Sequence, residues 1–583
     1  MKPLRLWPGV VLAIIVVILR FIAPGVIPNG FIIGGLGAAV GGVLVVLWWL
    51  FFSHAQWTDR LLAIVLMAVG ILVTMLVAHP SMSGIMVPVI LVPGTLVPVF
   101  VAWAVLTRRS STSVRRATMA LAILAGCGVW ALARVDNIVV DGGTLFAWRW
   151  TPTGEERLLA EARNEVLPAP APAAPAPATN ETEPKPAVAA VAPVDYGISR
   201  VAWSGFRGPN RDGVIQNTRI RTDWTAAAPR EVWRRRIGPG WSSFAVAGDL
   251  IFTQEQRGDD ELVSAYRLST GAPVWRHRDN ARFYDTAGGA GPRGTPTVHK
   301  GRVYAMGATG IVNALDATTG ALIWTRSAEA DTGARHPGWG FAASPIVHGD
   351  LVITAASGRL AAYDLETGTL KWTRTTGGGG YSSPHLATID GVEQILLQKG
   401  GGIIGVALDG TVLWDHKGGD GIAMLQPVVL SDGSLLVASA DMMVGLGVRR
   451  LQVSRHDDRT WTVEERWMSR GLKPYFDDYV AHKGHAYGFD GTILSAINLE
   501  TGERVWKGGR YGNGQLLLLP DQDLLLVTSE QGDVVLVAAA PDKQTEIAKF
   551  KAVEGTTWNH PVLVGNLLLV RNGEEMAAFR LPK

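Results

Sequence analysis

The chain has a single cysteine among its 583 residues, Cys127, and this residue lies inside an apolar stretch. One thiol excludes an intrachain disulfide, a thiolate-ligated zinc site and the attachment motif of a c-type haem. The chain also lacks a large excess of one charge sign, since 54 basic and 51 acidic residues give a formal charge of +3. So small a net charge gives no reason to expect nucleic-acid binding. From Glu231 onward the chain has almost no helical periodicity. What remains is a set of apolar runs near the start and a repeat further on.

Long apolar runs fill the first 134 residues. Each has 16 to 22 residues, about the length that a helix needs to cross a hydrocarbon core at ~1.5 Å rise per residue. A helix satisfies its own backbone polar groups in lipid, so we expect five membrane-spanning helices. The runs are residues 7–22, 31–52, 61–78, 85–106 and 117–133.

Basic residues are distributed unevenly among the connections between these runs. They precede the first run and occupy the second and fourth connections, whereas residues 23–30 and 79–84 contain none. By the positive-inside rule the amino terminus is cytoplasmic, and five crossings place the chain after residue 133 on the opposite side. The residues are Lys2, Arg5, Arg60, Arg108, Arg109, Arg115 and Arg116.

Two features inside the apolar runs are unusual. Arg20 lies near the outer end of the first run, where we expect its long side chain to extend towards the membrane surface. Pro88, Pro93 and Pro98 are evenly spaced in the fourth run. Packed membrane helices tolerate proline, and the alternative is a broken helix around a small-molecule or quinone site.

A proline-rich segment divides the chain. Thr153 and Glu156 have the spacing of a capping box, which predicts a short amphipathic helix near the membrane. Residues 168–193 contain eight prolines and favour extended polyproline II, a semi-rigid arm of up to roughly 80 Å. The predicted domains are a helical membrane domain at 1–134, a membrane-proximal segment at 135–167, this linker at 168–193 and a β domain at 194–583.

A repeated phrase accounts for the rest of the chain. "VNALDATTGALIW" ends at Trp324 and "LAAYDLETGTLKW" at Trp372, and intervals of 39 to 53 residues separate successive aromatic residues at that position. A period of ~40 to 50 residues with short alternating strands predicts the blades of a β-propeller. The aromatic residues are Trp275, Trp324, Trp372, Trp414, Trp467, Trp506 and Phe550.

One repeat, residues 294–327, illustrates the expected blade. An inner strand ends at Val298, a hairpin turn uses Lys300 and Gly301, and two further strands lead to a turn with Gly320 at a position of positive φ. The outer strand follows, and its tryptophan is expected to wedge between neighbouring blades because each sheet has two apolar faces to cover.

The two ends of the repeat region predict the number of blades. The last repeat stops after three strands, and residues 231–237, "EVWRRRI", form an outer strand without a blade of its own. Together they make an eighth blade that closes the ring and removes its free edges. We therefore expect an all-β eight-bladed propeller.

The motifs "LDATTGALIW", "YDLETGTLKW" and "INLETGERVW" resemble the PQQ-like β-propeller repeat of the pyrroloquinoline quinone dehydrogenases. "WSGFRGPNRDGV" from Trp203 and "GWGFAASPIVHGDLVI" from Gly338 resemble a membrane-anchored bacterial branch of this family. That branch is similar to the B-component lipoprotein of the outer-membrane β-barrel assembly machinery. The resemblance implies a periplasmic propeller anchored in the bacterial inner membrane, with a binding or scaffold role in the envelope that includes outer-membrane protein assembly.

A second resemblance implies an alternative function. Five helices before a periplasmic propeller are similar to the layout of membrane-bound quinoprotein glucose dehydrogenase, which implies oxidation of an alcohol or sugar with PQQ and calcium and electron transfer to membrane quinone. The chain lacks that family's large insertions and the adjacent cysteine pair of its alcohol-oxidising relatives. No set of Glu, Asn and Asp residues matches the calcium ligands.

Candidate binding residues lie in the segments that join one blade to the next, which converge at one mouth of a propeller channel. These segments are rich in glycine and aromatic residues, and aromatic faces beside a guanidinium and an amide can hold a flat ligand or an extended peptide. In the alternative interpretation, glycine permits tight crossings and the aromatic residues pack on one another. The candidates are Trp241, Arg293, Trp339, Tyr381, Asp477, Trp558, Asn559 and His560.

Two further pairs suggest metal or acid–base chemistry. Asp477 and Asp478 are adjacent, and because neighbouring strand residues point to opposite faces we expect a solvated loop pair. His482 and His485 flank a hairpin turn, and His299 and His348 occupy the position of His482 in other repeats, so we interpret them as hairpin residues and predict no zinc site. We predict no catalytic set and no protein-ligated metal.

Overall fold

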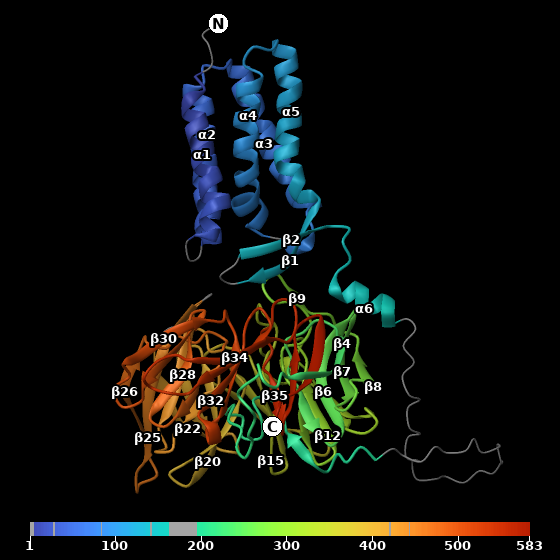
Figure 1. The fold of residues 1–583 in the computed structure, drawn as a ribbon, viewed down its shortest axis with the longest axis vertical. Coiled ribbons are helices and arrows are strands. Elements are labelled where there is room, and N and C mark those ends of the chain that lie inside the picture. The colour runs from blue at the N-terminus through green and yellow to red at the C-terminus, as the bar shows by residue number, and fades with distance from the viewer. Residues whose placement is uncertain are drawn as a thin grey trace, which may run out of the picture. The chain divides into compact units, whose positions relative to one another are not determined.

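The computed structural model describes residues 5–26, 30–82, 84–139, 143–162, 195–418, 421–441 and 444–583, so the expected linker at 168–193 lies outside the described residues. The described chain divides into two compact units, a helical unit within residues 1–153 and a β-sheet unit that contains residues 154–285 and 289–583 (Figure 1).

Apolar helices build the helical unit. Among the described residues, the helices long and apolar enough to cross a membrane are Ile33–Phe52, Trp57–Val77, Met86–Leu106 and Thr112–Ala131. The expected fifth span is corrected, because the first apolar helix, Trp7–Ile22, is shorter and rises only ~24 Å against a hydrocarbon core of ~30 Å. The α-helices are α1 (Trp7–Val17), α2 (Gly30–Leu47), α3 (Trp57–Val77), α4 (Val92–Leu106) and α5 (Thr112–Gly128), and π-helical turns cover Ile18–Ile22, Trp48–Phe52 and Met86–Leu91.

Arg20 does not extend out of the bundle. Its residue surface is 7% exposed, and a Cβ placed on Gly94 would lie 2.7 Å from the Arg20 Cγ. The prediction that Arg20 extends towards the surface is therefore wrong, because the missing side chain at Gly94 of α4 makes room for the arginine inside the unit.

The prolines of the fourth apolar run lie where the helix departs from regular geometry. Pro88 is part of the π-helical turn Met86–Leu91, Pro93 stands at the start of α4, and Pro98 is inside it. Nearby, the Thr95 hydroxyl donates to the Gly126 carbonyl at 2.7 Å and accepts from the Trp130 indole at 2.9 Å. These bonds attach α4 to α5 within a packed bundle.

The segment after the helices contributes to both units. The hairpin of β1 (Ala133–Val139) and β2 (Gly143–Trp148) belongs to the helical unit, and α6 (Gly154–Ala162), at the predicted short helix, belongs to the β-sheet unit. Leu158 of α6 is 5% exposed. Charged contacts attach α6 to the last and first blades of the propeller, namely Glu155–Arg282 at 2.8 Å, Arg157–Glu574 at 2.9 Å and Glu161–Arg236 at 2.9 Å.

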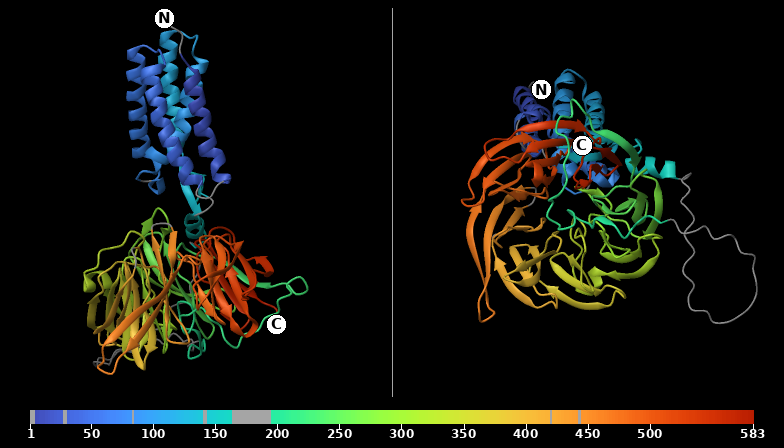
Figure 2. Two further views of the ribbon diagram at one scale, coloured as in Figure 1. Left: turned by 90° about the vertical axis from the view of Figure 1, so that its left-hand side faces the viewer. Right: turned by 60° about the horizontal axis from the view of Figure 1, so that its bottom comes forward.

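The β-sheet unit is an eight-bladed propeller, as the described residues show in eight sheets arranged as a ring (Figure 2). The first four blades are β5–β8 (Ala245–Ala247, Leu250–Arg257, Asp260–Arg267, Pro273–Asp279), β11–β14 (Thr297–His299, Arg302–Met306, Ile311–Asp316, Leu322–Ser327), β15–β18 (Ile346–His348, Leu351–Ala356, Arg359–Asp364, Leu370–Thr375) and β19–β22 (His385–Ile389, Val392–Lys399, Gly402–Val406, Val412–Lys417).

The next three blades are β23–β26 (Val428–Val429, Leu435–Asp441, Val444–Arg455, Trp461–Ser469), β27–β30 (Val480–His482, His485–Asp490, Ile493–Asn498, Arg504–Arg510) and β31–β34 (Gln515–Leu519, Leu524–Thr528, Asp533–Ala538, Glu546–Lys551). Smaller elements are β3 (Val201–Trp203), which adds a strand to the first blade, a short hairpin of β9 (Tyr284–Asp285) and β10 (Gly289–Ala290), and α7 (Ala328–Thr332).

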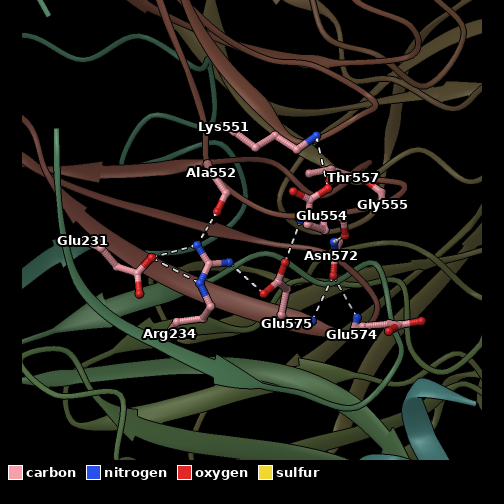
Figure 3. Close-up of polar contacts among 10 residues, drawn as sticks. All are labelled: Glu231, Arg234, Lys551, Ala552, Glu554, Gly555, Thr557, Asn572, Glu574 and Glu575. Atoms are coloured by element: carbon pink, nitrogen blue, oxygen red, sulfur yellow. Dashed lines mark hydrogen bonds and ion pairs between the residues drawn. The ribbon is translucent and has the colours of Figure 1, made fainter. Parts of the chain in front are cut away.

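The eighth blade closes the ring as predicted. It joins β35 (Val562–Val564), β36 (Leu567–Arg571) and β37 (Glu575–Arg580) to β4 (Arg230–Arg236), with Ala578 opposite Trp233. Arg234 of β4 reinforces this blade by donating to Glu575 at 2.7 Å and to the Ala552 carbonyl of the seventh blade at 2.8 Å (Figure 3). Both ends of the β region therefore share one sheet.

The repeated phrase specifies contacts between neighbouring blades. Gly320 has φ +73°, and a Cβ at this position would lie 2.5 Å from the ring of Trp275 in the preceding blade. The Trp275 indole donates to the Ala317 carbonyl at 3.0 Å, and Trp233, Trp324, Trp372, Trp467 and Trp506 donate in the same way. The expected wedge is confirmed. Trp414 differs, because its indole bonds Gln394 of its own blade at 2.6 Å.

Candidate channel-mouth site

The segments between blades are joined to one another by hydrogen bonds at the start of the inner strands. The Ser243 amide donates to the Thr295 hydroxyl at 3.0 Å, the Thr295 amide to the Ser344 hydroxyl at 2.9 Å, and the Ser344 amide to the Ser383 hydroxyl at 2.9 Å. Each bond links one blade to the next. Small hydroxyl residues before the inner strands therefore fix the mouth of the channel.

Aromatic rings from these segments form a continuous row, which we call the aromatic row. Trp241, Trp339, Tyr381 and Trp558 were predicted from the sequence, and Tyr475 and Phe476 complete the row. Ring centroids are 4.7 Å apart for Trp241–Trp558, 5.2 Å for Trp558–Phe476, 5.2 Å for Phe476–Tyr475, 6.5 Å for Tyr475–Trp339 and 5.1 Å for Trp339–Tyr381.

Tyr475 and Phe476 are not among the predicted candidates, because the adjacent carboxylates Asp477 and Asp478 are the more conspicuous chemical signal in the same connection. The signal was present in "PYFDDY", where two neighbouring aromatic residues occupy the connection between the fifth and sixth blades. All rings of the row except Tyr475, which is 7% exposed, keep a partly exposed surface. The row combines residues from distant repeats into one apolar surface.

Residues 204–215, which we call the channel segment, lie in the central channel beneath this row. The Ser204 carbonyl accepts from Val298 of the second blade at 2.8 Å, and the Ile215 amide donates to Leu518 of the seventh at 2.8 Å. Between them, Arg211 donates to the Ser344 and Pro345 carbonyls at the third blade, both at 3.0 Å. Figure 2 shows this part of the chain, in teal, crossing the centre of the ring.

Asp478 is buried in an ion-paired cluster with the channel segment. Its Oδ2 lies 2.8 Å from Arg207 Nε and 2.5 Å from His560 Nε2, and its residue surface is 1% exposed. Burial alone raises the pKa of a carboxyl, but Arg207 and His560 outweigh it and hold the pKa of Asp478 below its usual value. The expected solvated pair of aspartates is therefore wrong, because Arg207 comes from a segment about 270 residues away in the chain.

Asp477 is buried without a comparable cation. It is 0% exposed, and its Oδ1 accepts from the Tyr475 amide at 2.9 Å. Burial raises the pKa of Asp477 to about 8, with a smaller contribution from the negative charge of Asp478. Two adjacent carboxyls thus have pKa values shifted in opposite directions, and burial favours the protonated form of Asp477.

The other polar candidates are engaged by the protein itself. Arg293 lies 2.5 Å from Asp285 and donates to the Gly291 carbonyl at 2.6 Å, which holds the β9–β10 hairpin. The Asn559 amide donates to the carbonyls of Gly240 at 3.2 Å and Ser242 at 2.7 Å. The structure therefore gathers the aromatic candidates into one surface, whereas the polar candidates fix the segments below it.

The residues at this mouth do not fit a quinone paired with calcium. Arg207 and His560 engage the Asp478 carboxylate, and the channel segment lies where the channel would open. Within the described ranges, no group of three or more His, Cys, Asp or Glu residues gathers as potential metal ligands. His482 and His485 face each other across the β27–β28 hairpin, as predicted, and His482 Nε2 lies 2.6 Å from Asp523 of the next blade.

Comparison with known proteins identifies the repeat type. The family model described as outer membrane protein assembly factor BamB matches residues 216–383 and, in an overlapping match, 259–444. No curated protein matches the chain.

Several solved structures resemble the chain. BamB from Moraxella catarrhalis is 18% identical and covers 61% of this chain and 98% of its own, with a TM-score of 0.42. A europium-containing methanol dehydrogenase is 11% identical over 65% of this chain and 98% of its own, with a TM-score of 0.49. A quinohemoprotein alcohol dehydrogenase from Comamonas testosteroni is 12% identical over 66% of this chain and 82% of its own, with a TM-score of 0.45.

Proposed function

Since residues 216–444 carry repeats that match the BamB family model, we propose that this chain is a membrane-anchored propeller of the bacterial envelope that binds an extended polypeptide across its channel mouth. The family name suggests outer-membrane protein assembly as its setting. The observation that carries the proposal is the aromatic row, a partly exposed apolar surface above a channel that the chain's own residues 204–215 occupy. Such a surface suits a ligand that lies across the mouth.

An extended polypeptide can follow the length of the row. Neighbouring rings are in contact, with centroids 4.7 to 6.5 Å apart, so side chains that repeat every ~6.8 Å on one face of a strand can rest on successive parts of one continuous surface. Aromatic surfaces also contribute strongly to peptide binding, because they bury a large area at low conformational cost. A small flat ligand would contact only part of a row that draws on several blade junctions.

The basic connections support a periplasmic propeller. Arg116 Nε lies 2.8 Å from Asp59 Oδ1, so the start of α5 and the start of α3 meet at one end of the bundle, together with Arg60. By the positive-inside rule this end is cytoplasmic, and α5 then leads to the periplasm whether or not the short first helix crosses the membrane. The inner membrane is the proposed location.

Peptide binding by the full-length protein in detergent tests the function. A fluorescein-labelled 15-residue peptide with alternating Phe and Ser residues is titrated by fluorescence anisotropy against wild type, Trp339→Ala and the control Trp461→Leu, a tryptophan of β26 outside the row. We expect about tenfold weaker binding for Trp339→Ala, the usual loss for an aromatic contact of ~1.4 kcal/mol, and no change for the control.

Equal affinities for wild type and Trp339→Ala would refute the proposal. The same preparation is mixed with PQQ and calcium and assayed for dye reduction with alcohols and aldoses. Substrate-dependent reduction would instead assign the quinoprotein dehydrogenase function and an electron path to membrane quinone.

A further inference from the structure

A cluster of cations adjoins the aromatic row at the sixth blade. Lys473 lies in the same connection as Tyr475 and Phe476, and its Nζ is 3.2 Å from Asp490 Oδ1. Lys507 of β30 lies 2.7 Å from Asp490 Oδ2, and Arg504 donates to the same oxygen. We call Lys473, Arg504 and Lys507 the cationic cluster.

The cluster carries more positive than negative charge. Its three cations converge on one carboxylate that is 6% exposed, while their own side chains are 31 to 38% exposed. Arg234 of the closing blade offers a contrast, because it lies between two carboxylates, Glu231 and Glu575 (Figure 3). The cationic cluster therefore presents a net positive charge to solvent beside an apolar surface.

We propose that the polypeptide bound at the mouth is acidic, with apolar side chains on the aromatic row and carboxylates at the cationic cluster. The inference rests on the proposed function and adds the chemistry of the partner. Lys473 and the partly exposed Phe476 are three residues apart, so their Cα atoms lie within ~11 Å, and one extended segment reaches both.

Charge complementarity favours a polypeptide over an anionic lipid as the occupant. A lipid headgroup brings one compact charge, whereas the aromatic row runs through rings from several blade junctions and needs a ligand with several apolar side chains in sequence. An acidic polypeptide supplies both chemistries along one chain. Opposite charge at the edge of an interface also speeds association and selects partners.

Three labelled 15-residue peptides test the proposal with the full-length protein in detergent. The peptides alternate Phe with Asp, with Asn or with Lys. The charge variant is Lys473→Gln/Lys507→Gln, which keeps Arg504 on Asp490 and so avoids leaving a buried carboxylate without a partner. Lys551→Gln is the matched control, because Lys551 lies on β34 of the next blade and pairs with Glu554 at 3.6 Å and Asp533 at 4.0 Å.

We expect wild type to bind the Asp peptide about tenfold more tightly than the Asn peptide, and the Lys peptide most weakly, with a preference that declines as salt rises. In the charge variant the Asp peptide should fall to the affinity of the Asn peptide, while the Asn peptide and the Lys551→Gln control stay unchanged.

The outcomes separate this inference from the function on which it rests. If Trp339→Ala weakens all three peptides while the charge variant keeps the wild-type preference, the acidic partner is refuted and the binding function stands. If wild type binds none of the peptides, the proposed function falls. If wild type binds all three peptides equally, while a soluble short-chain anionic phospholipid binds wild type more tightly than the charge variant, the cluster is assigned to lipid and the proposal is overturned.

Discussion

Replacement of Asp477 by Asn should remove much of the dependence of stability on pH. Asp477 has a folded pKa of about 8, against an ordinary value of 3.8 in the unfolded chain. Because the folded value is raised, the protonated carboxyl contributes stability that is fully present below pH 4 and is lost as pH rises to 8. A difference of about four units corresponds to ~5 kcal/mol at most, at 1.36 kcal/mol per unit.

Asn is neutral at every pH and has the shape of the protonated aspartate. The difference in unfolding free energy between Asp477→Asn and wild type should therefore be small at pH 4 and grow to several kcal/mol at pH 8, in favour of the variant. Thermal unfolding of the full-length protein in detergent, followed at pH 5, 6, 7 and 8, measures the growing gap between the two melting temperatures.

Two control variants isolate this effect. Glu261 is 2% exposed, and burial raises its pKa to about 7. Its protonated carboxyl therefore also contributes stability that is lost as pH rises from 4.5 to 7, and Glu261→Gln should remove only this contribution to the pH dependence. Asp478→Asn leaves the buried Arg207 without its carboxylate and should cost about 3–5 kcal/mol while the slope due to Asp477 persists. A pH slope in Asp477→Asn equal to that of wild type would refute the reasoning.

Two further predictions concern closure of the ring and attachment of α6. Trp233→Phe removes the indole N–H that donates to the Leu268 carbonyl at 2.8 Å. The free energy of unfolding should fall by about 1 kcal/mol, measured as a lower melting temperature. An unchanged melting temperature would show that this hydrogen bond does not stabilise the ring. Glu155→Gln removes the charge that pairs with Arg282 at 2.8 Å and should make hydrogen exchange of the α6 backbone amides faster, with Glu500→Gln as the exposed control. Equal exchange rates in both variants would contradict a role for Glu155 in attaching α6.

Local pattern predicted the blades well because each blade is a short-range structure. The turn with Gly320, the strand that follows it and the tryptophan three residues into that strand lie within a few residues of each other. The closing blade was also predictable, because a repeat that lacks its outer strand and a lone strand at the other end leave one pairing. Apolar length alone located the helices, including the first at its bounds Trp7–Ile22, but that helix is too short to count as a span.

The sequence predicted the aromatic residues of the candidate site but not the environment of its carboxyls. Glycine and aromatic residues in the connections identified Trp241, Trp339, Tyr381 and Trp558, because the connections of a propeller must meet at one mouth. The protonation states of Asp477 and Asp478 were not accessible, since adjacent residues look alike in a sequence and differ only in which one faces Arg207.

The sequence by itself determined an eight-bladed ring, its point of closure and a group of apolar helices, because repeats, turns and hydrophobic length are local properties. Only the tertiary structure decided that residues 204–215 occupy the channel, that Arg20 packs on Gly94 and that α6 joins the propeller. Each of these depends on contacts between residues far apart in the chain, where burial and opposite charge select a partner that no local pattern specifies.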